Sequence, residues 1–221
     1  MRKIAKIKIR CSSLLFILAT LLIAVGCTHN EIKTLDGFNA IEWFKMGQQA
    51  SLDDQWDKAL YAFNKAIELD QKVANAYVNR GRIYYHLGNY DHAIADYNKV
   101  IELNPEDAVT YANRGNVYYK LGNYNQAIAN YNKVIELDPK DTHVYVSRGG
   151  VYVKLGNHNQ AIADYNKAIE LNAEYALAYY NRGLAYSAFG NHNQAIADWK
   201  TAARLGLKEA QDYLKQQRIA W

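Results

Sequence analysis

Apolar and polar residues recur along most of the chain with the spacing of amphipathic helices. In residues 108–120, and again in 124–137, the apolar and small residues follow one another at intervals of three and four. Such spacing places them on one face of a helix, so it predicts two helices that each bury a stripe. Residues 121–123 (Leu-Gly-Asn) separate the two, and their glycine has the backbone freedom that a tight turn requires. Residues 138–139 (Asp-Pro) end the unit, because proline cannot continue a helix.

The same helix-turn-helix pattern returns every 34 residues. The tripeptide Asn-Arg-Gly at residues 79–81 recurs at 113–115 and 181–183, and as Ser-Arg-Gly at 147–149. A fixed period of this length indicates one supersecondary unit stacked on copies of itself. The sequence therefore predicts an all-α solenoid, and function is expected on the surface that the stack creates.

The repeated unit closely resembles the tetratricopeptide repeat, a helix-turn-helix of 34 residues. The resemblance rests on small residues at the eighth and twentieth positions and on an aromatic residue at the twenty-fourth. These are Gly47, Gly81, Gly115, Gly149 and Gly183, then Ala59, Ala93, Ala127, Ala161 and Ala195, then Phe63, Tyr97, Tyr131, Tyr165 and Trp199. Small residues let the two helices approach closely, and the aromatic ring fills the space beside them.

The resemblance implies an α-solenoid with the form of a right-handed superhelix. Its five repeats are expected at residues 40–73, 74–107, 108–141, 142–175 and 176–209. A C-terminal capping helix is expected at 210–221, where apolar residues alternate with polar ones at helical spacing. The first repeat is divergent, with Asp54 in place of the turn glycine, as is common for a terminal repeat that lacks a neighbour on one face.

The beginning of the chain is a different kind of sequence. A basic head precedes an apolar run at 14–25, and Gly26-Cys27 closes it. This order is typical of a secretory signal. The segment 24–27 resembles the end of a bacterial lipoprotein signal, which implies that residues 1–26 are removed and that Cys27 carries the lipid, with 27–39 as lipidated cysteine and tether. An uncleaved membrane anchor is the alternative, because no charged residue lies between Cys11 and Asn30.

Removal of the signal changes the charge of the chain. The sequence has 26 Lys and Arg and 22 Asp and Glu, but five of the basic residues lie in the signal, which leaves 21 and a net charge of −1. The mature part therefore gives no support for nucleic-acid binding. With Cys11 removed and Cys27 acylated, no thiol remains in the folded part, as suits an oxidising envelope compartment. Thr28 is not Asp, which by resemblance to diderm lipoproteins favours the outer membrane, facing the periplasm.

In tetratricopeptide repeats the first helix of each unit lines a concave groove that binds extended peptides or partner helices. We call the following the predicted groove residues: Asn79, Arg82, Tyr85, Asn113, Asn116, Tyr119, Lys120, His143 and Asn181. The repeated asparagine at the sixth position is similar to the asparagine ladder of some tetratricopeptide superhelices, whose amides hold a peptide backbone. The alternative is a tolerated polar residue on a solvated face, since Ser147 interrupts the series. The family's carboxylate clamp does not match in any window.

Two further features bear on function. Arg80, Arg114, Arg148 and Arg182 stand where the family usually has leucine, and we expect their stems to pack and their guanidinium groups to pair with Asp or Glu of a neighbouring helix; a row for anionic ligands is the alternative. The histidines have no metal-binding spacing, and the chain has no phosphate loop or nucleophile motif. We therefore expect no enzyme activity, cofactor or metal.

These observations favour a membrane-attached envelope lipoprotein that acts as a scaffold and binds other proteins. A ligand- or glycan-binding protein that uses Arg82, Tyr85, Tyr119 and Lys120 is the first alternative. A homo-oligomeric structural spacer is the second.

Overall fold

The computed structural model describes residues 37–221, so the predicted signal and Cys27 lie outside the described residues. This part of the chain contains eleven helices and no strand. None of these helices is both long enough and apolar enough to cross a bilayer. The chain divides into two compact units, at Met1–Leu103 and Asn104–Trp221.

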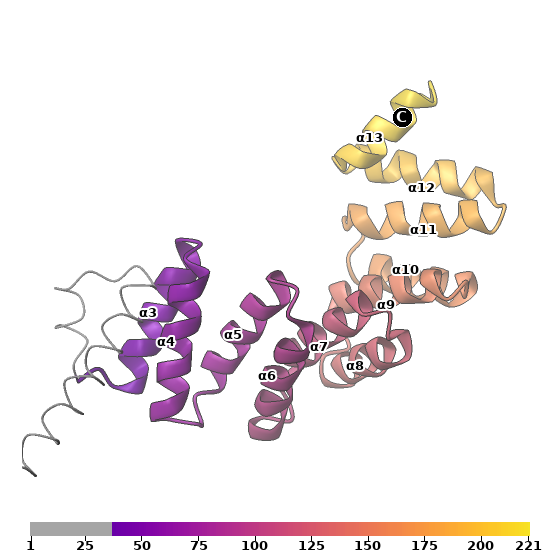
Figure 1. Cartoon of the computed structure of the whole chain (residues 1–221). Helices are drawn as coiled ribbons and strands as arrows, with labels where there is room; N and C mark the ends of the chain where they lie inside the picture. The colour runs from indigo at the N-terminus through magenta and orange to yellow at the C-terminus, as the bar shows by residue number, and fades with distance from the viewer. Residues whose placement is uncertain (1–36) are drawn as a thin grey trace, which may run out of the picture. The chain divides into compact units, whose positions relative to one another are not determined.

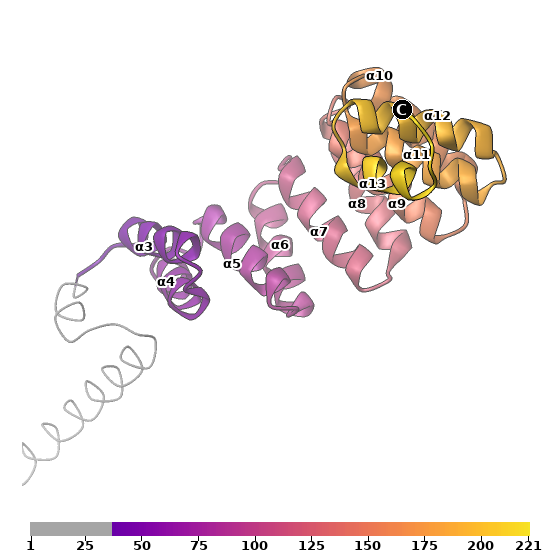
Figure 2. The same cartoon turned by 90° about the horizontal axis from the view of Figure 1, so that it is seen from above.

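Unit 1 contains two helical hairpins. The first pairs α3 (Ala40–Leu52) with α4 (Trp56–Leu69), and the second pairs α5 (Ala74–His86) with α6 (Tyr90–Leu103). Helix α4 also packs against α5, so the second hairpin stacks on the first (Figure 1, Figure 2). The core of this stack is buried on α3, α4 and α5, around Trp43, Phe63 and Ile83.

Unit 2 contains three hairpins and a last single helix. The hairpins pair α7 (Ala108–Lys120) with α8 (Tyr124–Leu137), α9 (Thr142–Lys154) with α10 (His158–Leu171), and α11 (Ala176–Ala188) with α12 (His192–Arg204). Helix α13 (Lys208–Gln216) packs on α12, as Figure 1 shows at the yellow end of the chain. All-α hairpins stacked in sequence define an α-solenoid, which confirms the fold class predicted from the repeat.

A glycine and an aromatic ring hold each hairpin together. A Cβ atom added to Gly81 would lie 2.8 Å from the ring of Tyr97, and one added to Gly149 would lie 2.6 Å from the ring of Tyr165. The same approach occurs between Gly47 and Phe63. The eighth position is therefore glycine because the ring of the second helix occupies the space of a side chain, as predicted.

The turn within each hairpin needs a left-handed residue. Gly88, Gly122, Gly156 and Gly190 have φ between 74° and 86°. In the first hairpin this position is Asp54, with φ 55°, a conformation that aspartate tolerates better than most residues. The divergent first repeat thus keeps the turn without the glycine.

The last helix differs from the predicted segment 210–221 at both ends. Helix α13 begins at Lys208 and ends at Gln216, and Arg218 follows in the left-handed region with φ 57°. Leu207 at its N-cap packs against the adjacent core, so the helix begins before the predicted bound at 210. Leu214 is fully buried, and the rings of Trp199 and Tyr213 meet edge to face at 4.5 Å, so α13 covers the end of the last hairpin.

Candidate functional site

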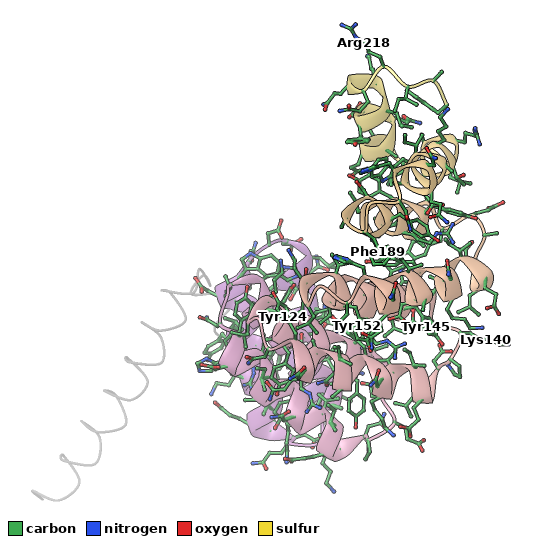
Figure 3. The ribbon with its side chains drawn as sticks, turned by 90° about the vertical axis from the view of Figure 1, so that its right-hand side faces the viewer. Tyr124, Lys140, Tyr145, Tyr152, Phe189 and Arg218 are labelled. Atoms are coloured by element: carbon green, nitrogen blue, oxygen red, sulfur yellow. The ribbon has the colours of Figure 1, made fainter. Side chains whose placement is uncertain are left out.

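The arginine of the repeated tripeptide is a structural residue. Arg148 donates from Nε and Nη2 to the carboxylate of Asp164 at 2.9 and 2.6 Å, and from Nη1 to Oδ1 of Asn132 at 2.6 Å. Its guanidinium also lies 5.9 Å from the rings of Tyr145 and Tyr152, which Figure 3 labels. Arg80 and Arg182 make the same set of bonds, with Asp96 and with Asp198. The expected pairing with an acid of a neighbouring helix is confirmed for these three arginines, and it is wrong for Arg114, whose partner at this position is an asparagine.

These ion pairs are largely buried, and burial affects the pKa values. The hydrogen bond to Asp164 raises the pKa of Arg148, because it stabilises the charged guanidinium. Burial raises the pKa of Asp96 above its ordinary value, even though Arg80 acts in the opposite direction. The repeated bidentate geometry links the second helix of one hairpin to the first helix of the same hairpin. The Nη1 bond reaches the second helix of the hairpin before it.

The third repeat replaces the acid with an amide. Arg114 donates from Nε to Oδ1 of Asn130 at 2.9 Å, and the amide nitrogen of Asn130 donates to the carbonyl of Gln126. Asn130 is buried, as are the aspartates at the equivalent positions. A neutral acceptor therefore serves in the place where the other repeats have a carboxylate.

The predicted groove residues divide between the two units. Asn79, Arg82 and Tyr85 lie on α5 of unit 1, and the other six lie on α7, α9 and α11 of unit 2. In unit 1 the structure brings Asn79 and Arg82 together in the wall of a pocket with a volume of about 250 Å³. The pocket is lined by Gln48, Ser51, Leu52, Trp56, Asn79, Arg82, Ile83 and His86.

The surroundings of this pocket are aromatic. The ring of Trp56 stacks on that of His86, with centroids 6.3 Å apart and an interplanar angle of 23°. Tyr85 does not line the pocket; its ring contacts His86 at 5.6 Å and Tyr90 at 5.8 Å. The amide nitrogen of Asn79 donates to the carbonyl of Asn75 at 3.0 Å, which leaves the side-chain oxygen of Asn79 to accept from a ligand.

In unit 2 the two asparagines of the sixth position are half-buried and accessible. Within residues 104–221, no side-chain hydrogen bond occupies the amide of Asn113 or that of Asn181. Asn116, in contrast, accepts a hydrogen bond from the hydroxyl of buried Tyr131 at 2.7 Å. Its carbonyl therefore helps to satisfy the core, and the side chain is less free to bind a peptide than the sequence suggested.

The remaining predicted groove residues of unit 2 differ in their surroundings. His143 is exposed, and its Nδ1 lies 2.8 Å from the hydroxyl of Tyr175. Tyr119 is half-buried, with its ring 6.0 Å from that of Tyr124. Lys120 is exposed at the end of α7. This surface offers amide, imidazole and ammonium groups to a ligand.

Sequence reasoning missed Trp56 as a site residue. Trp56 is the first residue of α4, a second helix of a hairpin, whereas the family groove is assigned to first helices. The signal that could have found it is the series Trp56, Tyr90, Tyr124, His158 and His192, in which the first repeat has the largest ring. Within residues 37–221 no cluster of three or more His, Cys, Asp or Glu side chains could hold a metal ion.

Helical hairpins repeated every 34 residues, with accessible polar groups along their first helices, define a class of repeat proteins that bind ligands on an extended surface. The model of the TPR repeat matches residues 54–88, 81–122, 115–156 and 149–190, and that of the tetratricopeptide repeat matches 176–205. The chain belongs to the tetratricopeptide repeat family. Proteins of this family bind other proteins, so the fold supports a protein-binding role.

Solved structures with the same fold include MamA and YrrB. One MamA structure is 26% identical, with a TM-score of 0.69, over 75% of this chain and 97% of that chain. MamA of Desulfovibrio magneticus RS-1 is 20% identical, with a TM-score of 0.71, over 80% and 98%. YrrB, described as a TPR protein with an unusual peptide-binding site, is 23% identical, with a TM-score of 0.66, over 83% and 97%. The comparison with curated proteins gives no significant match.

Proposed function

We propose that the protein is a non-enzymatic scaffold of the cell envelope, whose first-helix surfaces bind extended segments or helices of partner proteins. The observation that carries this proposal is the state of Asn113 and Asn181. Their amides are accessible, and no side-chain hydrogen bond within residues 104–221 occupies them. An amide offers one donor group and one acceptor, which match the N–H and C=O of an extended chain whatever its sequence.

Membership of the tetratricopeptide repeat family and the likeness to YrrB, a TPR protein with a peptide-binding site, both support this proposal. The test is capture of envelope proteins by the full-length protein. The double variant Asn113→Ala with Asn181→Ala should retain them less well. A matched control is Asn159→Ala with Asn193→Ala, two exposed asparagines on the second helices α10 and α12. Equal loss in both double variants, or loss in neither, would remove the asparagines from the binding surface.

We further propose that Cys27 carries a lipid that attaches the scaffold to the outer membrane, facing the periplasm. The basic head, the apolar run and Gly26-Cys27 support this proposal. Two or more acyl chains, each with about 0.8 kcal/mol per buried methylene, would hold the protein stably on a bilayer. Cys27→Ala should release the protein from membrane fractions. Continued membrane attachment of this variant, with residues 1–26 still present by mass spectrometry, would show an uncleaved anchor instead.

A further inference from the structure

The pocket of unit 1 differs in kind from the rest of the predicted groove surface. It lies among α3, α4 and α5 and has a volume of about 250 Å³. Pockets for drug-sized ligands usually have at least about 300 Å³. The pocket therefore matches one large side chain rather than a whole small molecule.

Apolar groups form one part of the wall. Ile83, a buried residue, lines the pocket, and the ring of Trp56 stacks on that of His86. Leu52, on the same wall, remains 79% exposed, the largest exposed fraction among the large apolar residues of the described chain. A bulky apolar side chain in the pocket would cover Leu52 and the face of Trp56, and burial of such surface is the usual source of binding free energy.

The polar part of the wall carries one arginine and no acid. Arg82 is exposed, and within residues 37–103 it forms no ion pair, whereas Arg80, two residues before it, is bound to Asp96. No acidic residue of unit 1 lines the pocket. An unpaired guanidinium next to an apolar wall is complementary to a carboxylate, which it can bind with two parallel hydrogen bonds.

From these observations we infer that the pocket receives one bulky apolar side chain of a partner peptide while Arg82 binds a carboxylate on the neighbouring residue. This inference rests on the proposed function and adds its specificity. The amides of the sixth position can hold any peptide backbone, but the ninth position is Gln48, Arg82, Asn116, Gly150 and Leu184 in successive repeats, so only the second repeat has a cation there. The pocket thus sets which residue of the peptide lies at the second repeat.

Three small probes separate the two requirements. All three are N-acetyl dipeptides with an amidated C-terminus. Phe-Asp (the acid) has the ring and a carboxylate on the neighbouring residue, Phe-Asn (the amide) has the ring alone, and Gly-Asp has the carboxylate alone. Binding to the full-length protein is followed through the indole N–H signals of its four tryptophans, with Trp56→Phe to assign one of them. We expect the acid to shift the Trp56 signal and leave Trp199 and Trp221 unchanged. Loss of either the ring or the carboxylate should weaken binding about tenfold.

The variant that tests the cation is Arg82→Gln, because this side chain is exposed and lies outside the core, so we expect the variant to fold. It should bind the acid and the amide equally. Arg204→Gln, at an exposed arginine of α12, is the matched control and should behave like the unsubstituted protein. Equal binding of acid and amide by the unsubstituted protein would overturn the inference, and so would the absence of a Trp56 shift.

The pocket assignment and the proposed scaffold function can be disproved separately. If the acid does not bind but partner capture still depends on Asn113 and Asn181, only the pocket assignment is wrong. If the acid binds at Trp56 and capture does not depend on these asparagines, the pocket stands and the proposed peptide-binding surface of unit 2 is wrong.

Discussion

Gly149 and Gly150 are neighbours on α9 that have opposite surroundings. A Cβ on Gly149 would lie 2.6 Å from Cε1 and 3.0 Å from Cζ of Tyr165, which is buried in the core of unit 2. A Cβ on Gly150 would meet nothing within 4 Å. The first glycine is therefore required by packing, and the second only makes the helix less stable.

Alanine substitutions at these two positions should have effects of opposite sign. Gly150→Ala should raise the free energy of unfolding by about 0.5 to 1 kcal/mol, because alanine restricts the unfolded chain and favours the helix. Gly149→Ala should lower it by about 1 to 3 kcal/mol, because the Tyr165 ring must move. Urea denaturation of both variants measures the difference. A stabilising Gly149→Ala would mean that the close approach to Tyr165 is not needed.

The partner of the repeated arginine differs between repeats: it is Asp164 for Arg148 and Asn130 for Arg114. Asp164→Ala should lower the free energy of unfolding by about 2 to 3 kcal/mol, since it leaves the largely buried Arg148 guanidinium without its carboxylate. Asp164→Asn should cost less, because it keeps an acceptor for Nε as Asn130 does for Arg114. Thermal unfolding of the two variants ranks them. If both substitutions lower the free energy of unfolding equally, the hydrogen bond to the amide does not stabilise the fold.

At the scale of the helix, α3 is the only helix in residues 37–221 with a capping box. Asn39 accepts from the backbone of Ile41 and Glu42, while the side chain of Glu42 accepts from the backbone N–H of Asn39 at 2.8 Å. Inside the stack, α8 and α10 begin at an asparagine whose side chain makes no capping bond, whereas Asp141 caps α9. Packing on both sides stabilises those helices, whereas α3 has a described neighbour on one side alone.

This difference predicts unequal effects of the same substitution. Asn39→Ala should lower the free energy of unfolding by about 1 kcal/mol, the usual contribution of an N-cap side chain. Asn157→Ala, at the N-cap of α10, should change it by less than about 0.5 kcal/mol. Hydrogen exchange at the first turns of α3 and α10 locates each effect. Faster exchange at α10 in Asn157→Ala would reveal a capping bond there.

For the molecule as a whole, buried tyrosines make the stability of the fold depend on pH. Burial raises the pKa of Tyr97 and of Tyr165, because the phenolate is poorly solvated in the core. In the unfolded chain a tyrosine ionises near pH 10. Above that pH the unfolded state binds fewer protons than the folded state, so stability is complete below about pH 10 and is lost as the pH rises further.

The midpoint of thermal unfolding should therefore fall steeply above about pH 10. Tyr165→Phe should reduce this fall, since it removes a buried hydroxyl group with a raised pKa. Tyr124→Phe, at a half-buried ring outside the core cluster of buried residues, is the control. If the midpoint of thermal unfolding falls equally with rising pH in all three proteins, these tyrosines do not determine its pH dependence.

Much of the architecture was open to prediction because its causes lie close together in the sequence. The 34-residue step, the helical spacing of apolar residues and the glycine and aromatic positions all indicate the hairpin, and the structure has it. Pairing of the repeated arginine was predicted in kind. Its partners were not, because Asp96 and Asn64 belong to two different helices that meet Arg80 only after packing.

The site was harder to predict than the hairpins, again because residues of different helices meet only after the helices pack. Spacing places Asn79 and Arg82 on one face of a helix, since both lie on the same regular element. It does not show that Asn116 is bound by Tyr131, or that Trp56 and Leu52 complete a pocket with Arg82. The repeat alone thus determined the family, the hairpins and the exposed first-helix positions. Tertiary packing decided which of those side chains remain free for a ligand, because such contacts depend on how separate helices approach one another and on the rotamers that this approach allows.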